Sequence, residues 1–315
     1  MNATNTVKVR PSRMYRLSKT IRTDKFLLLM VLPMFIYYIV FRYIPMFGVY
    51  FAFTDFKPGR MWQSNWVGLK HFMEFFRSFY FTRVLRNTVT LSSLSLVFSF
   101  PVPIIFALLL NEVRVKHLPF KRVVQTVSYL PHFISVVVVV GLLRNFLDTR
   151  HGIVNSIIMN MGGERINFFA LPQWFRPLYI GSGIWQGFGW ASIIYIAAIS
   201  GIDPQLYEAA SIDGASRWKQ VWRITIPGIS QTIIILLILN LGGIMSVGFE
   251  KILLMYSSAT YETADVISTY VYRKGIQETR YAFGIAVDLF NSVINFILVY
   301  SANRISRRIS SISLW

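Results

Sequence analysis

Long apolar runs alternate with shorter polar segments along the whole chain. The runs cover about residues 26–53, 84–110, 123–143, 177–200, 230–249 and 281–302. A helix needs about 20 residues to cross the roughly 30 Å of bilayer hydrocarbon, and each run is about that long or longer. Because lipid offers no partner for backbone N–H and C=O groups, each run is expected to be helical. The pattern therefore predicts an all-α integral membrane protein with six transmembrane helices.

Composition supports the membrane interpretation and narrows the function. Of the 315 residues, 54% are hydrophobic and only 15% are charged, which is too apolar for an ordinary soluble domain. The net charge of +18 is compatible with nucleic-acid binding, but no basic run interleaved with aromatic residues lies in a soluble domain. Anchoring to membrane lipid and orientation in the membrane account better for the charge. With no cysteine, the chain forms no disulfide and has no thiol chemistry.

The distribution of Lys and Arg predicts the orientation. Residues 1–25 are strongly basic, with Asp24 as their one acid, and are expected to form a cytoplasmic tail. Six spans place both termini on the same side, where Lys and Arg are denser than in the long loops opposite. We therefore predict a transmembrane domain over 26–305, with the N-terminus and the C-terminal tail (306–315) inside.

A polar segment, 203–229, separates the fourth and fifth runs and carries its own helix signals. Asp203 followed by Pro204 is typical of an N-cap and a first helical residue. Gly214 suits the position just after a helix, where a left-handed backbone is easiest without a Cβ. A second short helix is expected to begin near Ser216. The segment therefore predicts two short helices across a glycine turn at a membrane face.

The same segment carries a motif of the form E-A-A-x-x-D-G-A, followed by an isoleucine and a proline. Its residues are Glu208, Ala209, Ala210, Asp213, Gly214, Ala215, Ile224 and Pro227. The motif resembles the EAA loop of type I ABC importer permeases, in which this loop is a coupling helix docked in a groove of the cytoplasmic ATPase. The resemblance implies that Glu208 makes a charged contact with the ATPase and that Ala209 and Ala210 permit close docking. Many relatives have a second proline soon after the first, which this chain lacks.

Four longer segments extend the resemblance over most of the chain. Residues 43–56, 87–112, 120–139 and 247–272 are similar to the oligosaccharide and polysaccharide branch of the sugar permeases. The resemblance implies ATP-driven import of sugars across a prokaryotic cytoplasmic membrane by alternating access. It also implies three kinds of partner: a second, homologous permease, two copies of a cytoplasmic ATPase, and an external solute-binding protein. ATP and Mg would then bind to the ATPase, and this chain would need no cofactor.

Signatures of catalysis are missing from the sequence. There is no GxxxxGK[ST] loop for ATP, no HExxH metal motif and no G-x-S-x-G nucleophile elbow. The four histidines are scattered without metal-ligand spacing. We expect a non-catalytic permease subunit. The alternatives are an integral-membrane enzyme, which would need a catalytic set of residues, and a stand-alone secondary transporter, which would more typically show paired halves.

Polar side chains inside the predicted spans are candidates for a substrate path, because such groups usually face a bundle interior or a water-filled route. Asp288, Asn291 and Asn295 are spaced to share one face of the sixth span. Asn240 lies near the middle of the fifth span and Gln186 lies in the fourth. These five residues are predicted to line a sugar path. The alternative is that they form hydrogen bonds between helices.

The charge of the sugar is left open by the sequence. A neutral sugar needs only amides and aromatic rings, whereas an acidic sugar would also need a cation. Arg42, Arg86 and Arg144, all towards the outer mouth, are the nearest candidates for that cation.

Overall fold

The structure is a computed structural model that describes residues 23–59, 63–112 and 118–310. Most of the predicted basic tail and the end of the C-terminal tail lie outside these ranges. The regular secondary structure of the described residues is helical, and their only strand-like pairing is an isolated bridge between Thr54 and Trp66. The prediction of an all-α protein is therefore confirmed.

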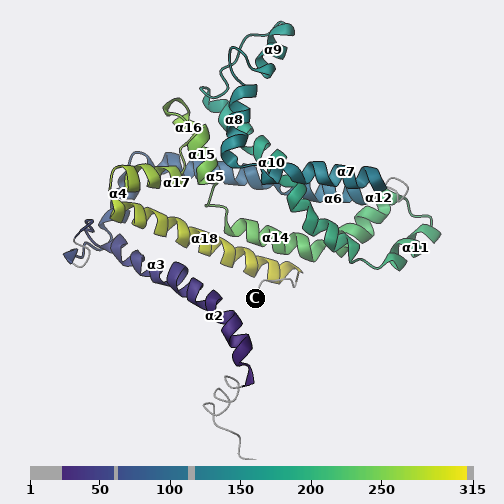
Figure 1. The fold of residues 1–315 in the computed structure, drawn as a ribbon, viewed down its shortest axis with the longest axis horizontal. Coiled ribbons are helices and arrows are strands. Elements are labelled where there is room, and N and C mark those ends of the chain that lie inside the picture. The colour runs from purple at the N-terminus through teal and green to yellow at the C-terminus, as the bar shows by residue number, and fades with distance from the viewer. Residues whose placement is uncertain (1–22, 60–62, 113–117, 311–315) are drawn as a thin grey trace, which may run out of the picture.

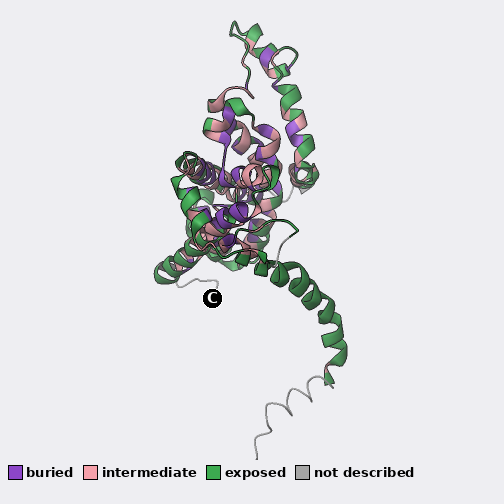
Figure 2. Cartoon of the chain, turned by 90° about the vertical axis from the view of Figure 1, so that its left-hand side faces the viewer, coloured by how far each residue is buried: buried purple, intermediate pink, exposed green. Residues whose placement is uncertain are grey.

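The N-terminal helix stands apart from the rest (Figures 1 and 2). It runs without interruption through α2 (Lys25–Tyr38), the π-helical η1 (Ile39–Tyr43), α3 (Ile44–Met46) and the 3₁₀-helical η2 (Phe47–Phe53). None of the residues of α2 is buried, although nearly all are apolar. Only η2 returns to pack against α18 (Tyr281–Ser310). A helix that is apolar on every side belongs in lipid or against another membrane protein.

The central bundle consists of long helices that lie roughly side by side (Figure 1). Its members are α5 (Phe81–Ser99), α6 (Pro101–Asn111), α7 (Leu118–Tyr129), α10 (Pro172–Ser200), α14 (Ser230–Gly242) and α18. Helix α10 packs along α5, α6 and α7, while α14 packs along α18. Near the end of the bundle that carries segment 203–229, Ala107, Tyr195, Ile199 and Ile229 form one buried apolar cluster.

The third apolar run is not one straight helix, which corrects the expectation of a simple span over 123–143. After α7, the 3₁₀-helix η5 (Leu130–Phe133) leads to a break, and α8 (Val136–Phe146) departs at 100°. Pro131 in η5 has no N–H to continue a helical ladder. Ile134 and Ser135 are extended, and the Ser135 hydroxyl caps α8 by accepting from the N–H of Val138. Beyond α8, α9 (Ile153–Asn160) completes an arm that projects from the bundle (Figure 1).

By length and composition, three continuous helices among the described residues can cross a membrane: 25–53, 81–111 and 281–308. Two bent pairs, 119–133 with 136–146 and 217–228 with 230–242, raise the number to five if each pair is one span. Helix α10 has 29 residues but is not among them, because it is more polar. The fold is that of a membrane bundle, and the predicted six spans exceed what these criteria count.

Short helices cover the end of the bundle opposite α11 (Pro204–Ile212) (Figure 1). They are α4 (Lys70–Arg77), α15 (Phe249–Met255), η7 (Ser258–Thr260), α16 (Tyr261–Ala264), α17 (Ile267–Val271) and η8 (Tyr272–Gln277). Asp265, which is fully buried, forms ion pairs with Arg83 of α5 at 3.3 Å and Arg273 of η8 at 2.7 Å. Asn87 of α5 donates to the backbone carbonyls of Glu262 and Asp265. The cap is thereby bound to α5 through buried polar contacts.

Gly189 provides the test of the packing between α10 and α7. A Cβ there would collide with the backbone carbonyl of Ser128 on α7, whereas a Cβ at Gly181, on the same helix, meets nothing within 4 Å. We expect Gly189→Ala to destabilise the protein by about 1–3 kcal/mol through overpacking. Gly181→Ala is the matched control and should leave stability unchanged or raise it slightly. Thermal unfolding of the purified protein measures both, and an equal effect of the two substitutions would contradict the close approach.

Candidate functional site

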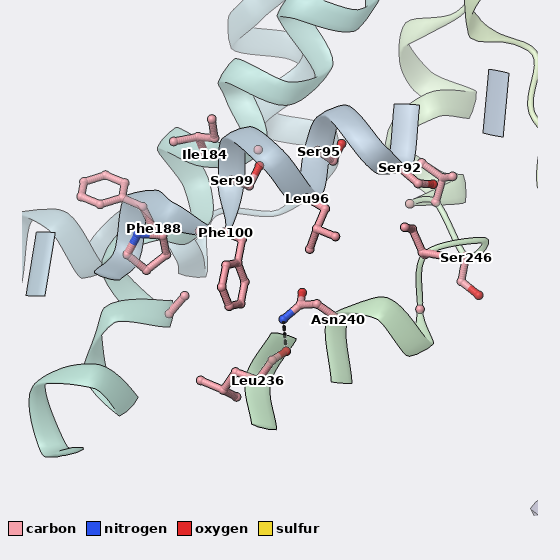
Figure 3. Close-up of a pocket in the computed structure, with 18 of the residues that line it drawn as sticks. Ser92, Ser95, Leu96, Ser99, Phe100, Ile184, Phe188, Leu236, Asn240 and Ser246 are labelled. Atoms are coloured by element: carbon pink, nitrogen blue, oxygen red, sulfur yellow. Dashed lines mark hydrogen bonds between the residues drawn. The ribbon is translucent and has the colours of Figure 1, made fainter. Parts of the chain in front are cut away.

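A cavity of about 410 Å³ lies between α5, α6, α10, α14 and the turn that follows α14 (Figure 3). None of the side chains that line it is charged at neutral pH. Its polar groups are side-chain hydroxyls, one side-chain amide and backbone groups. The polar side chains are those of Ser92, Ser95, Ser99, Tyr179, Tyr195, Asn240 and Ser246.

One wall of the cavity is a row of serines on α5. Ser92, Ser95 and Ser99 lie along one face of the helix, across the cavity from Asn240 (Figure 3). The hydroxyl oxygens of Ser92 and Ser95 are buried and have no hydrogen-bond partner among the described residues. An unmade hydrogen bond of a buried group costs about 1–3 kcal/mol. A ligand rich in hydroxyl or carboxylate groups would supply the missing partners.

A second wall of the cavity is the glycine-bearing side of α10. Gly183 and Gly187, one helical turn apart, both line the cavity, and a Cβ at Gly187 would meet nothing within 4 Å. Phe188 and, from α6's side of the cavity, Phe100 add aromatic surface (Figure 3). At Gly183 and Gly187 the backbone of α10 itself lines the cavity, between the larger side chains of the same helix.

Tyr179 and the turn after α14 close one end of the cavity. The Tyr179 hydroxyl accepts a hydrogen bond from the N–H of Gly248 at 3.1 Å. Asn295 of α18 supports the same turn, because its Oδ1 accepts from the N–H of Met245 and its Nδ2 donates to the Ser246 hydroxyl, both at 3.0 Å. The turn is therefore held from two sides.

Of the five residues predicted to line a sugar path, only Asn240 lines this cavity. Its Nδ2 donates to the carbonyl of Leu236 in its own helix. Asn295 and Gln186 instead brace neighbouring backbone, with Gln186 donating to the Ile134 carbonyl at the break before α8. Asn291 is buried with an unpartnered Oδ1, and Asp288 is exposed. The role of these residues as sugar contacts stays a prediction.

Sequence reasoning missed the serine row. Its signal is present in the spacing, because Ser92, Ser95 and Ser99 follow the i, i+3, i+7 pattern of one helical face. The predicted path consisted of amide and acidic side chains. Hydroxyl groups cost less than these groups in a membrane helix and are therefore less conspicuous in the sequence. Gly183 and Gly187 also have the spacing of one helical face, but small residues at such a spacing are equally typical of close helix packing.

The segment 203–229 has the local structure that its sequence predicts. The Asp203 side chain caps α11 by accepting from the N–H of Gln205 at 2.9 Å. Gly214 has φ = +71°. The N–H groups of Gly214 and Ala215 bond back to the carbonyls of Ser211 and Ala210, which is the Schellman end of a helix.

The second helical part of this segment continues into the bundle. Ser216 caps α12 (Arg217–Gln220), which leads through the π-helical η6 (Val221–Thr225) to α13 (Ile226–Gly228) and then α14. A hydrogen bond of 2.9 Å between the hydroxyls of Tyr207 and Thr225 joins the two parts. Arg217 pairs with Glu112 at the end of α6 at 3.3 Å.

Helix α11 presents an exposed surface at the end of the bundle (Figure 1). Glu208 and Ala209 are exposed, Ala210 is half-buried, and Ile212 is 87% exposed. This combination of an acid, small residues and uncovered apolar side chains is typical of a surface that a partner covers.

The family of the chain follows from comparison with known proteins. Residues 99–311 match the family described as "Binding-protein-dependent transport system inner membrane component". This range is well over half of the chain, so the protein belongs to that family of membrane permeases.

Individual relatives give the more particular class. Protein LplB of Bacillus subtilis is 44% identical over 289 residues, covering 91% of this chain and 90% of that protein. The polygalacturonan/rhamnogalacturonan transport system permease protein YteP of the same organism is 46% identical over 286 residues, covering 90% and 88%. The crystal structure of a bacterial ABC transporter involved in the import of the acidic polysaccharide alginate contains a chain that is 48% identical, with a TM-score of 0.87, covering 94% of this chain and 99% of that one. The protein is thus a permease component of an ABC sugar importer, and its relatives are transport proteins rather than enzymes.

Substitutions of Asn240 and Asn295 distinguish polar residues that contact the sugar from polar residues that support neighbouring backbone. Asn240→Leu loses only a bond within its own helix, so the variant should assemble normally while sugar uptake falls. Asn295→Leu should instead lower the melting temperature, because the buried N–H of Met245 loses its acceptor at a cost of about 1–3 kcal/mol. Complex yield, melting temperature and uptake should be measured on the same preparations. Normal uptake by assembled Asn240→Leu would contradict a role of Asn240 in the path.

Proposed function

We propose that the chain forms one half of the membrane channel of an importer for oligosaccharides derived from acidic polysaccharides. The observation that carries this proposal is the cavity, which has two buried, unpartnered serine hydroxyls and several glycines in its lining. Such a lining offers hydrogen bonds and flat apolar surface, which together suit a sugar chain. The charge of the substrate is inferred from the relatives that act on alginate and polygalacturonan, whose sugar units carry carboxylates.

The energy for transport comes from a separate ATPase, which binds ATP and Mg. In this proposal α11 docks on that ATPase, with Glu208 as the charged contact and Gly214 fixing the turn. Supporting features are the exposure of α11 and its place at one end of the bundle (Figure 1). Closure of an ATPase dimer would then pull on α11 and shift the bundle between inward-open and outward-open states, since ATP binds the two states differently.

The same proposal sets the topology. Six spans, with α10 as one of them and both termini inside, place α11 in the cytoplasm and the cap around Asp265 outside. The external cap would then receive a solute-binding protein. A related structure is described as the alginate transporter in complex with an alginate pentasaccharide-bound periplasmic protein; its matching chain is 47% identical, with a TM-score of 0.88, covering 95% of this chain and 100% of that one.

A second permease is the partner proposed for the exposed N-terminal helix. Residues of α2 are apolar and uncovered on all sides, so part of this surface is available to another membrane subunit as well as to lipid. We propose a non-identical, homologous partner. Full transport by this chain with the ATPase alone, in the absence of any second permease, would contradict the heterodimer.

Glu208→Lys tests the docking of α11. Reversal of a charge at an interface with the ATPase should reduce substrate-stimulated ATP hydrolysis about tenfold or more. Membrane insertion should be unaffected, because Glu208 is exposed and makes no contact on which α11 depends. Glu164→Lys, an equally exposed site in the loop after α9, is the matched control and should behave like the wild type. Normal transport by Glu208→Lys in proteoliposomes would refute the assignment.

Uptake of defined sugars tests the substrate class. Proteoliposomes that contain both permeases and the ATPase, supplied with the binding protein, should import galacturonate or mannuronate trisaccharides in an ATP-dependent manner. The neutral counterparts, galactotriose and mannotriose, should be imported more slowly. Import of the neutral sugars at equal or greater rate would contradict an acidic substrate, and import of none of the four would contradict the oligosaccharide path.

A further inference from the structure

Lys251 in α15 is a cation that lies directly behind the wall of the neutral cavity. Its Nζ donates a hydrogen bond of 2.9 Å to the backbone carbonyl of Tyr179 and lies 5.0 Å from the centre of the Tyr179 ring. Tyr179 itself lines the cavity, as do Gly183 and Gly248. The amine is therefore one residue layer away from the space in which a sugar would sit.

This ammonium group has no counter-ion among the described residues. Lys251 is only 8% exposed, yet no described carboxylate lies within 4 Å of it. Burial lowers the pKa of Lys251 to about 8. Arg83 of α5 and Arg273 of η8, by contrast, share the carboxylate of Asp265. A buried charge without a partner is costly, so its presence beside a cavity is a sign of function.

Gly183 leaves the amine close to the cavity. A Cβ at this position would lie 3.4 Å from the Lys251 Nζ, and Gly183 itself lines the cavity. Gly183 therefore has no side chain that could shield the amine at this point of the wall. An ammonium group has three donors, and the Tyr179 carbonyl takes one of them.

We propose that Lys251 pairs with a carboxylate of an anionic sugar in the cavity, past the bare backbone of Gly183, and so selects acidic over neutral oligosaccharides. This inference rests on the proposed function and names the residue that provides its charge selectivity. The hydroxyls of Ser92 and Ser95 on α5 would form hydrogen bonds with the same sugar. A uronate residue offers both kinds of partner, a carboxylate and hydroxyl groups, within one ring.

A purely structural role for Lys251 makes different predictions. In that case the amine only fastens α15 to α10 through the Tyr179 carbonyl, and its removal would lower stability and affect every sugar alike. A specificity role affects acidic sugars alone, and it depends on charge and therefore on salt.

The test measures sugar binding to the complete transporter in nanodiscs, without the binding protein, so that the selectivity of the binding protein does not enter. The probes are galacturonate trisaccharide and its neutral counterpart galactotriose. Lys251→Met should weaken binding of the galacturonate about tenfold, the usual order for a lost charge-assisted hydrogen bond, and leave galactotriose binding unchanged. Lys251→Arg, which keeps the charge, should retain most of the preference. The melting temperature of Lys251→Met should not fall, since an uncompensated charge is removed.

A second variant keeps the test decisive if Lys251→Met fails to assemble. Gly183→Ala preserves the lysine and its bond to Tyr179 but places a methyl group in van der Waals contact with the amine at the cavity wall. It should weaken galacturonate binding more than galactotriose binding, whereas Gly181→Ala, on an exposed face of the same helix, should change neither.

The outcomes separate this inference from the proposed function. Equal losses for both sugars, or unchanged galacturonate binding in Lys251→Met, would overturn the role of Lys251 while leaving the sugar path in place. Failure of the wild-type transporter to bind either sugar would overturn the sugar path and the role of Lys251 together. A galacturonate preference that disappears in Lys251→Met and persists in Lys251→Arg would establish that Lys251 selects acidic sugars.

Discussion

The buried carboxylate of Asp265 is the constraint on which the end of the molecule covered by the short helices depends. It is shared by Arg83 and Arg273, and the hydrogen bonds and charge of Asp265 outweigh burial and raise the pKa of Arg273. Asn87 extends the network, because it donates to carbonyls of the cap and accepts from Arg176 of α10 at 3.0 Å. One buried charge thus joins α5, α10 and the cap. Removal of either side of such a pair would leave the other buried without compensation, at a cost of several kcal/mol.

The end of the bundle that carries segment 203–229 is held by apolar packing, with Ile229 in one buried cluster with Ala107 of α6. The ion pair Arg217–Glu112 between this segment and α6 has side chains that are 60% and 34% exposed. Exposed ion pairs contribute about 0–1 kcal/mol. The segment itself is internally well ordered by the cap at Asp203, the turn at Gly214 and the Tyr207–Thr225 bond. A segment that is ordered by its own hydrogen bonds and packed on the bundle through Ile229 is suited to transmit the movement of a docked partner as one body.

Local features of this chain could be predicted from its sequence, whereas features that depend on distant pairing could not. Asp203 and Gly214 define a helix start and end by their own chemistry, so segment 203–229 forms as expected. The 100° break before α8 involves Pro131, but its extended Ile134 carbonyl is satisfied by Gln186, 52 residues away. The cavity likewise depends on which helix faces are brought together. Asn295 has the spacing predicted for it, yet it supports a turn instead of the cavity, because α18 packs on α14.

A transport cavity must attract its substrate without retaining it, since transport requires release on the far side as much as binding. A fully charged side chain in the cavity wall would hold a carboxylate too strongly in a low-dielectric site. The arrangement here is milder: the wall is neutral, and the cation lies behind Gly183 with one donor already engaged by Tyr179. Burial also lowers the pKa of Lys251 to about 8, so the amine gives up its proton more readily than an exposed lysine. A movement of α10 relative to α15 would change the distance between amine and cavity, and through it the affinity for an anionic sugar. Because Lys251 belongs to α15 and is bonded to α10, the proposed pairing would couple the binding of an anionic sugar to the relative position of these two helices.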